Sequence, residues 1–243
     1  MSGKIRLDRL SFTYPNTNKK ILDNLSLYIY PEQIVAFVGK SGCGKTTLAN
    51  IIAGVQPGYK GKIYYNDILS NFLDLNVIRS QIGYLKQKSD LFAGTIKSNV
   101  CYSDDVPDNE RLDTALSLSY CDEFLNKMPM GVDTQLAMGG VGLSGGQGQR
   151  ISIARTMYTD PKILIFDEAT SALDSNSEKK FLDNLRIMMR GRTAILIAHR
   201  LSTIKKADMI YVLDRGKIVD SGTFEYLSEN SIHFKAQFES QIN

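Results

Sequence analysis

A glycine-rich stretch near the start of the chain has the residue types needed to hold phosphate groups. Residues 39–46 read Gly-Lys-Ser-Gly-Cys-Gly-Lys-Thr, which matches the pattern G-x-x-x-x-G-K-[ST] in full. Glycines allow left-handed backbone conformations, so that successive N–H groups can turn inward around the α- and β-phosphates of a nucleotide. Lys45 would then reach the β- and γ-phosphates, and the Thr46 hydroxyl would ligate Mg²⁺. The predicted contacts to the nucleotide in this region are Gly39, Ser41, Gly42, Cys43, Gly44, Lys45, Thr46 and Thr47.

The segments on either side of this loop suit a phosphate site. Ile34 to Val38 is a short apolar run rich in β-branched residues, which predicts a buried strand. Thr46 to Val55 has the spacing of an amphipathic helix, whose positive N-terminal end would face the phosphates. Cys43 lies where backbone groups bind the phosphates, so we expect its side chain only to fill space.

A second motif places two carboxylates at the end of a predicted strand. Ile163 to Phe166 is apolar and is followed by Asp167 and Glu168, which is typical of a buried parallel strand whose C-terminal edge faces a ligand. Asp167 is the expected partner of Mg²⁺, either as a direct ligand or through a hydrogen bond to one of the ligands. Glu168 could position or deprotonate a water that attacks the γ-phosphate. A plain core strand capped by solvated acids is the alternative, and it is favoured when this motif is taken alone.

A third motif prepares another helix N-terminus for an anion. In Leu143 to Gln147, Ser144 is a good N-cap, two glycines leave backbone N–H groups uncovered, and Gln149 to Tyr158 continues as a helix. The residues expected to face a phosphate here are Ser144, Gly145, Gly146 and Gln147. A flexible glycine-rich turn is the alternative. The sequence alone does not say whether the two helix N-termini meet within one chain.

These motifs, in their order along the chain, resemble the nucleotide-binding domain of an ABC transporter. The resemblance rests on the loop at 39–46, LSGGQ at 143–147, ILIFDEATSALD at 163–174 and IAHR at 197–200, and it runs from residue 4 to residue 230. It implies an α/β fold with a P-loop NTPase core built on a mainly parallel sheet, an added antiparallel β subdomain and a helical subdomain. The chain 1–243 would be one ABC ATPase domain, with 1–88 and 159–243 as the core and 89–158 as the helical subdomain that carries LSGGQ.

The resemblance also implies an activity and two partners. In that family two domains pack head to tail, so that LSGGQ of one copy closes on the ATP held by the phosphate loop of the other. The implied reaction is Mg²⁺-dependent hydrolysis of ATP, with Glu168 as general base and His199 holding the γ-phosphate. The implied second partner is the transmembrane domain of an exporter, at the cytoplasmic face of the membrane, and the isolated domain is expected to be soluble.

Further site residues are carried over position by position. Tyr14 matches the aromatic residue that stacks on adenine, although an ordinary edge-strand aromatic is as good an explanation of this residue alone. Gln87 matches the glutamine that touches Mg²⁺ or the attacking water, on the loop that faces the membrane domain. Asp174, in Ser171 to Asp174, matches the segment that crosses the dimer interface. His199 follows an apolar strand, and a lone histidine there is usually structural.

Composition agrees with this interpretation and excludes other classes. The 243 residues, 43% of them apolar, suffice for a sizeable core. A net charge of +3 with interspersed signs gives no reason to expect nucleic acid. Three cysteines at unrelated spacings suggest reduced thiols in a cytosolic setting, and Cys101 and Cys121 are expected to be small core residues. No apolar run approaches a membrane span and no signal peptide is recognisable, so we expect the membrane part upstream of Met1 in the native chain or in a separate subunit.

The remaining elements are predicted from patterning. Ile5 to Tyr14, Leu25 to Tyr30 and Lys62 to Tyr65 predict a mainly antiparallel sheet. Helical patterning runs from Ser89 to Met128, and Asp108 is the expected cap of a helix from Glu110 to Cys121. Later in the chain we expect a helix at 174–189 and a strand at 193–198, in a parallel core sheet.

Subfamily features lie between Gln87 and LSGGQ. Asp90 to Ile96 resembles the corresponding segment of exporters, and Met128 to Thr134 is similar to exporters of bacterial peptides and bacteriocins. Two positions depart from the exporter pattern: Met138 replaces a glutamate that contacts the coupling helices, and Gly148 replaces a basic residue. The first leaves the usual contact to the membrane domain in doubt, and neither removes a catalytic group.

Three rival classes can be weighed from the sequence. A superfamily member that acts on chromosomes or ribosomes would need a long coiled-coil insertion or a second cassette, and this sequence has neither. A phosphotransferase of the wider phosphate-loop class would lack LSGGQ and would need an acceptor other than water. The ATPase subunit of an importer stays open as an alternative, because direction rests only on Asp90 to Ile96.

Overall fold

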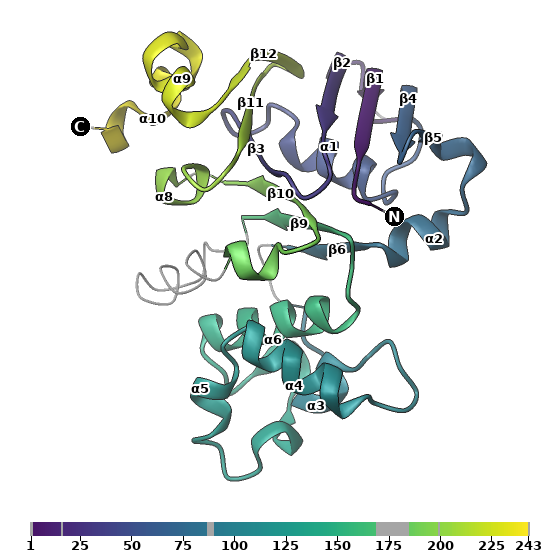
Figure 1. Ribbon diagram of the computed structural model, residues 1–243, viewed down its shortest axis with the longest axis vertical. Coiled ribbons are helices and arrows are strands. Elements are labelled where there is room, and N and C mark those ends of the chain that lie inside the picture. The colour runs from purple at the N-terminus through teal and green to yellow at the C-terminus, as the bar shows by residue number, and fades with distance from the viewer. Residues whose placement is uncertain (1, 16, 87–89, 169–184, 199, 243) are drawn as a thin grey trace. The chain divides into compact units, whose positions relative to one another are not determined.

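The computed structural model describes residues 2–15, 17–86, 90–168, 185–198 and 200–242. The chain forms two compact units. The first comprises Met1–Ile82, Lys162–Asp167 and Met189–Asn243, and the second comprises Gly83–Pro161 and Glu168–Met188. Figure 1 shows the elements of both.

A mainly parallel sheet forms the centre of the first unit. Its strands lie in the order β12 (Lys217–Gly222), β11 (Met209–Asp214), β3 (Ile34–Val38), β10 (Thr193–Ile197) and β9 (Ile163–Asp167). All neighbours pair in parallel except β12, which is antiparallel to β11. Every residue of β3 and β10 is buried, as expected for strands covered on both faces. The predicted parallel core sheet is thereby confirmed.

A second, antiparallel sheet belongs to the same unit. It has the order β2 (Lys20–Ile29), β1 (Ile5–Thr13), β4 (Lys60–Tyr65) and β5 (Ile68–Leu69), and the first three strands lie side by side in Figure 1. The predicted antiparallel sheet is confirmed, but β2 begins at Lys20 and not at Leu25. The extra residues pair with the end of β1 across irregular register, and Asn24 has a positive φ of 54°. This bulge breaks the alternation on which the prediction depended.

Helices complete the first unit. The most important is α1 (Lys45–Ile52), which packs on β9 and β10 and starts directly after the glycine-rich loop. The others are η1 (Ser70–Phe72), α2 (Leu75–Ser80), α8 (Leu201–Ile204), α9 (Phe224–Asn230) and α10 (Ile232–Ile242). Strand β6 (Ile82–Leu85) starts at the last residue of the unit's first segment and leads into the second unit.

The second unit is mainly helical. It contains β7 (Gly94–Thr95), α3 (Ile96–Val100), α4 (Asn109–Leu118), α5 (Asp122–Leu125), η2 (Gly131–Asp133), β8 (Gln135–Leu136), η3 (Met138–Gly140) and α6 (Gly145–Tyr158). Both α3 and α4 pack on α6. Asp108 caps α4 as predicted, since its carboxylate accepts from the Arg111 N–H at 3.1 Å. The two-residue pairing of β7 with β8 is too short for the sequence pattern to predict.

Two further predictions about elements can be compared with the structure. Of the helix expected at 174–189, residues 185–188 are helical and 174–184 lie outside the described residues. Among the residues that the structure describes, no helix is long and apolar enough to cross a membrane.

Candidate functional site

The loop between β3 and α1 depends on glycine at several positions. Gly39, Gly42 and Gly44 have φ angles of 149°, 75° and 110°, which favour glycine. A Cβ on Gly39 would overlap the carbonyl oxygen of Leu213 in β11, and one on Gly44 would lie 2.9 Å from the carbonyl oxygen of Ile21. A Cβ on Gly42, in contrast, would meet nothing within 4 Å. Two of these glycines are needed for close packing behind the loop, and the third leaves the front of the loop open to a ligand.

Lys45 places its ammonium group inside the loop. The residue is only 6% exposed, and its Nζ donates to the carbonyl oxygens of Gly39 at 2.7 Å and Lys40 at 3.2 Å. These two bonds satisfy a cation that burial would otherwise penalise. The loop therefore carries a positive charge at its centre, where a phosphate oxygen would find a charge-assisted donor.

Thr46 and Asp167 bring two oxygen ligands together. The Thr46 hydroxyl donates to Oδ1 of Asp167 at 3.3 Å. Thr46 is exposed in the first turn of α1, and Asp167 is half-buried at the carboxyl end of β9. A hydroxyl and a carboxylate beside a phosphate loop fit Mg²⁺, which commonly takes one or two protein ligands and completes its shell with water and phosphate oxygens.

Glu168 follows directly and has an unusual backbone. Its φ is 53°, a left-handed conformation that is strained in a non-glycine residue. The side chain is half-buried. The extended backbone of β9 therefore ends at Asp167, and Glu168 does not continue the strand.

Tyr14 lies just past the end of β1 and contacts the phosphate-loop helix. Its hydroxyl is 3.2 Å from Oγ1 of Thr47, the third residue of α1. Its ring meets Phe12 edge to face, with ring centroids 4.8 Å apart. The structure therefore joins Tyr14, predicted only by resemblance, to the loop predicted from its own residue types.

Ser144 begins α6 with a capping box. Its Oγ accepts from the Gln147 N–H at 3.2 Å, and its own N–H donates to Oε1 of Gln147 at 2.9 Å. The predicted N-cap is confirmed, although the helix starts at Gly145 and not at Gln149. Ser144 and Gly145 are exposed, so the positive end of a helix of 14 residues is open to a ligand in this unit.

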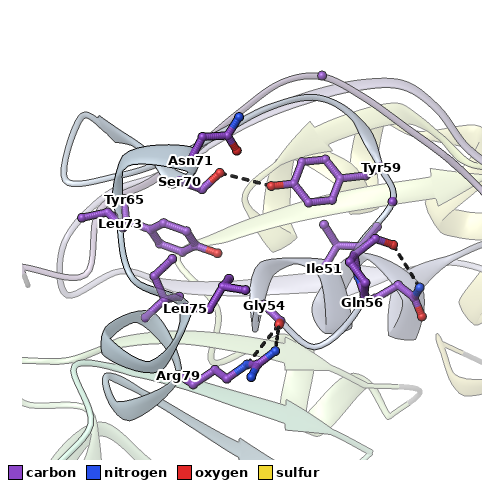
Figure 2. A pocket seen from close by; sticks show the side chains of 14 residues that line it. Ile51, Gly54, Gln56, Tyr59, Tyr65, Ser70, Asn71, Leu73, Leu75 and Arg79 are labelled. Atoms are coloured by element: carbon purple, nitrogen blue, oxygen red, sulfur yellow. Dashed lines mark hydrogen bonds between the residues drawn. The ribbon is translucent and has the colours of Figure 1, made fainter.

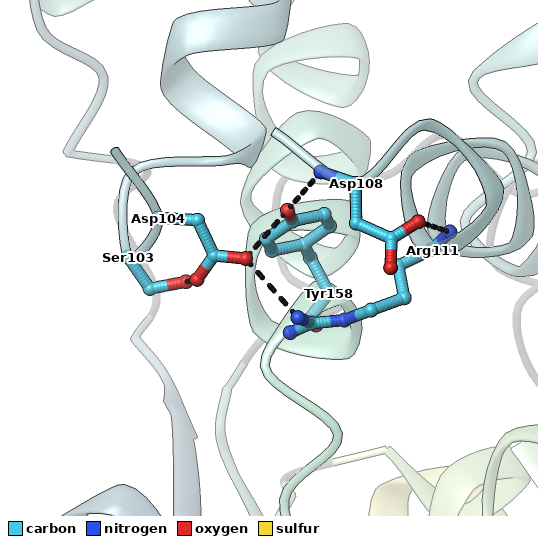
Figure 3. Close-up of polar contacts among 5 residues, drawn as sticks. All are labelled: Ser103, Asp104, Asp108, Arg111 and Tyr158. Atoms are coloured by element: carbon cyan, nitrogen blue, oxygen red, sulfur yellow. Dashed lines mark hydrogen bonds and ion pairs between the residues drawn. The ribbon is translucent and has the colours of Figure 1, made fainter. Parts of the chain in front are cut away.

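The other end of α6 is fixed by a polar cluster, shown in Figure 3. The Tyr158 hydroxyl accepts from the Asp108 N–H at 2.9 Å and donates to Asp104 at 2.8 Å. The Arg111 guanidinium lies over the Tyr158 ring and donates to Asp104 at 3.1 Å and to the Tyr158 carbonyl at 2.6 Å. The hydrogen bond from Tyr158, and after it one from Ser103, hold the pKa of Asp104 below its usual value. Sequence reasoning missed this cluster, because its members share no local motif.

Arg155 fixes the same helix to another segment. Its guanidinium donates to the Asn99 carbonyl at 2.7 Å, to Asn99 Oδ1 at 2.7 Å and to the Asp90 carbonyl at 2.9 Å. It also lies over the Phe92 ring, 5.0 Å from the centroid. Burial lowers the pKa of Arg155. Within the second unit, α6 and the segment 90–99 therefore hold each other in place.

The cysteines agree with their predicted roles. Cys43, Cys101 and Cys121 are all buried free thiols, and burial raises the pKa of each above its usual value. The Cys43 side chain packs behind the loop and is 6% exposed. Its burial agrees with the expectation that the side chain only fills space.

Three predicted site residues cannot be placed. Gln87, Asp174 and His199 lie outside the described residues. Glu168 and the LSGGQ residues belong to the second unit, whereas the phosphate loop, Asp167 and Tyr14 belong to the first.

A separate cavity lies in the first unit. Its volume is about 610 Å³, and it is lined by the end of α1, the loop from Gly54 to Gly61, and residues of η1 and α2. Figure 2 shows that polar side chains on its wall bond to their neighbours, with the Tyr59 hydroxyl 3.1 Å from Ser70 Oγ and Arg79 donating to the Gly54 carbonyl. None of the predicted nucleotide-binding residues that the structure describes lines it.

Comparison with known proteins defines the class. The ABC transporter family profile matches residues 22–171. The chain belongs to the ABC transporter family, and its fold is the predicted one, a P-loop NTPase core with an antiparallel β subdomain and a helical subdomain.

Similar proteins include lipid A-core flippases and a solved ABC exporter. An ATP-dependent lipid A-core flippase of Pseudomonas fluorescens is 43% identical over 229 residues, which are 93% of this chain and 38% of the relative. The flippase of Alkalilimnicola ehrlichii is 41% identical over 242 residues, 99% of this chain and 41% of the relative. A bacterial Atm1-family ABC exporter solved with ATP bound has a TM-score of 0.93 and 34% identity, and the match covers 100% of this chain and 42% of that one.

These relatives bear on two expectations from the sequence. They agree with the exporter resemblance of Asp90 to Ile96. The similarity of Met128 to Thr134 to peptide and bacteriocin exporters finds no support in these relatives, two of which are lipid A-core flippases. The chain spans about two fifths of the length of the relatives it matches.

Proposed function

We propose that this chain is the ATP-hydrolysing motor domain of an ABC exporter. The single observation that carries the proposal is the convergence of Lys45, Thr46 and Asp167 at one edge of the parallel sheet, since these groups can hold the phosphates and the Mg²⁺ of one ATP. The family membership and the ATP-bound exporter relative support it.

The phosphate loop would act by positioning and by charge. Lys45 would exchange its bonds to the Gly39 and Lys40 carbonyls for bonds to the β- and γ-phosphate oxygens. Backbone N–H groups of the loop would hold the α- and β-phosphates, and the face of Tyr14 would take the adenine. Thr46 and Asp167 would hold Mg²⁺, which neutralises developing charge on the phosphates when bound. Gln87 is the further proposed contact to Mg²⁺ or to the attacking water.

Hydrolysis itself needs few groups. Glu168 would accept a proton from the attacking water as its oxygen bonds to the γ-phosphorus. The bond from phosphorus to the β–γ bridging oxygen breaks, and ADP and inorganic phosphate are the products. His199 would hold the γ-phosphate during this displacement. Most of the rate enhancement in such a reaction comes from positioning and electrostatic stabilisation.

A second copy would complete each site. The Ser144 hydroxyl accepts from Gln147, so its own proton is available for a γ-phosphate oxygen of the partner's ATP. The exposed N-terminus of α6 adds a positive partial charge at the same point. Asp174 would lie at the interface between the two copies, and the helical subdomain, proposed as 89–158, would present LSGGQ.

The proposed setting is the cytoplasmic face of a membrane, beneath a transmembrane domain that belongs to the longer transporter or to a separate subunit. Lipid-like cargo is favoured over peptide by the flippase relatives. Cargo selection would lie outside this chain, so the motor proposal does not depend on it.

Phosphate release tests the proposal. The wild-type chain should release inorganic phosphate from ATP with Mg²⁺ and no added acceptor, and the rate per chain should rise with chain concentration because two copies form each site. Phosphate release only when an acceptor is added would favour a phosphotransferase. A rate strictly proportional to concentration at every dilution would contradict the shared site.

A further inference from the structure

The hydrogen bond between Tyr14 and Thr47 links two parts of the proposed ATP site. The two oxygens are 3.2 Å apart and come from residues 33 positions apart in sequence. Thr47 is 8% exposed and belongs to the first turn of α1, next to Thr46. Tyr14 is 36% exposed, so its ring is accessible while its hydroxyl is held.

Other contacts restrict the same ring. Phe12 meets it nearly at a right angle, with an interplanar angle of 84°. The Tyr14 carbonyl, directly after β1, accepts from the Thr17 N–H at 3.0 Å. The Tyr14 side chain is therefore held at two points, by Thr47 at its hydroxyl and by Phe12 at its ring.

The hydroxyl is not needed for stacking, because a phenylalanine offers a base the same aromatic face. We infer that Thr47 is a positioning residue for base recognition: through its bond to the Tyr14 hydroxyl it sets the orientation of the ring relative to the phosphate loop. This inference rests on the proposed function. The chemical class that it concerns is a nucleoside triphosphate with a planar base.

One hydroxyl can serve two partners. A threonine hydroxyl has one proton to donate and two lone pairs that accept. Tyr14 can therefore donate to Thr47 while Thr47 donates to a phosphate oxygen. This arrangement would connect the base platform to the phosphate site through a single side chain, so that correct placement of either end of the nucleotide favours the other.

The test compares ATP with inorganic tripolyphosphate, which has the phosphates and lacks the base. Dissociation constants are measured by calorimetry with Mg²⁺ for the wild-type chain and for Tyr14→Phe, which keeps the ring and removes the hydroxyl. Loss of one hydrogen bond predicts ATP binding weakened about two- to tenfold, with tripolyphosphate binding unchanged. Wild-type ATP affinity in Tyr14→Phe, or equal weakening of both ligands, would overturn the inference.

Variants of Thr47 provide the matched control. Thr47→Ser keeps the hydroxyl, so the ratio of its ATP affinity to its tripolyphosphate affinity should match that of the wild type. In the wild-type background, Thr47→Val should weaken the binding of ATP more than the binding of tripolyphosphate. When Tyr14→Phe is already present, Thr47→Val should weaken the binding of both ligands equally. Persistence of a base-dependent loss in the double variant would contradict the positioning role. If the wild-type chain binds neither ligand, the proposed function fails, and this outcome is distinct from all those above.

Discussion

The hydroxyl of Thr46 donates to the carboxylate of Asp167 at 3.3 Å, although 121 residues separate them in sequence. Each belongs to a motif that was interpreted separately, one in a glycine-rich loop and one at a strand end. The parallel pairing of β3 with β10 and of β10 with β9 brings both motifs to the same edge of the sheet. The contact therefore links the two halves of the predicted Mg²⁺ site within one unit.

This contact predicts how the protein depends on Mg²⁺. Asp167→Ala should raise the Mg²⁺ concentration needed for half-maximal phosphate release by roughly 10- to 100-fold, because a carboxylate proposed to hold the ion or one of its ligands is lost. Titration of Mg²⁺ at saturating ATP measures the effect. Thr46→Ser, which keeps the hydroxyl, is the control and should behave like the wild type. An unchanged Mg²⁺ titration for Asp167→Ala would exclude Asp167 from the metal site.

The loop glycines predict separable effects on stability and binding. Gly42→Ala should lower the free energy of unfolding by about 1–2 kcal/mol through its φ of 75° alone, since its Cβ meets nothing. It should also weaken ATP binding, because the new methyl group would lie at the open front of the loop, where the phosphates are proposed to bind. Gly39→Ala should destabilise the fold much further through overlap with Leu213. Urea unfolding and ATP calorimetry measure the two effects.

Gly131 provides a matched control for this comparison. Its φ is 48° and its Cβ would likewise meet nothing within 4 Å, but it lies in the second unit, outside the loop. Gly131→Ala should cost about the same stability as Gly42→Ala and leave ATP affinity unchanged. Equal ATP affinity in both alanine variants would show that the front of the loop is not a phosphate site.

The sequence predicted the elements whose signals are local. Five consecutive apolar residues predicted Ile34–Val38 with the bounds that the structure has, and a serine before two glycines predicted the cap of α6. The early start of β2 was missed, because a bulge interrupts its alternation. The Tyr158 cluster was missed because its hydrogen bonds join distant segments. Contacts of this kind have no local sequence pattern from which they could be predicted.

The site residues likewise divide into those that a local motif predicts and those that depend on contacts between distant segments. Lys45 and Thr46 could be predicted from motif chemistry, whereas the contact between Tyr14 and Thr47 depends on where β1 ends relative to α1. The peptide cargo was inferred from seven residues, Met128 to Thr134, that match one subfamily. So short a segment carries little information about the cargo.

Burial of Cys121 predicts a loss of stability in alkali. Burial raises the pKa of this thiol from 9.0 to about 12, so the folded chain keeps a proton that the unfolded chain releases above pH 9. Its contribution to stability is complete below pH 9 and is lost as the pH rises toward 12. Urea unfolding at several pH values should show that the free energy of unfolding declines less steeply above pH 9 in Cys121→Ala than in the wild type. The difference in slope should correspond to at most one bound proton. An unchanged slope would mean that Cys121 is not desolvated.

In the proposed mechanism, ATP joins two copies of this chain through the phosphate loop of one and LSGGQ of the other. Glu168→Gln should bind ATP, lose nearly all turnover and accumulate as a dimer, because closure persists when hydrolysis cannot release it. Adding Ser144→Arg to this variant should abolish the dimer and leave the ATP affinity of the monomer largely intact. Sedimentation velocity of both variants with and without Mg²⁺-ATP measures this. An ATP-dependent dimer of Glu168→Gln that Ser144→Arg removes is the predicted result; an ATP-loaded monomer at every concentration, or a dimer indifferent to Ser144→Arg, would contradict the account.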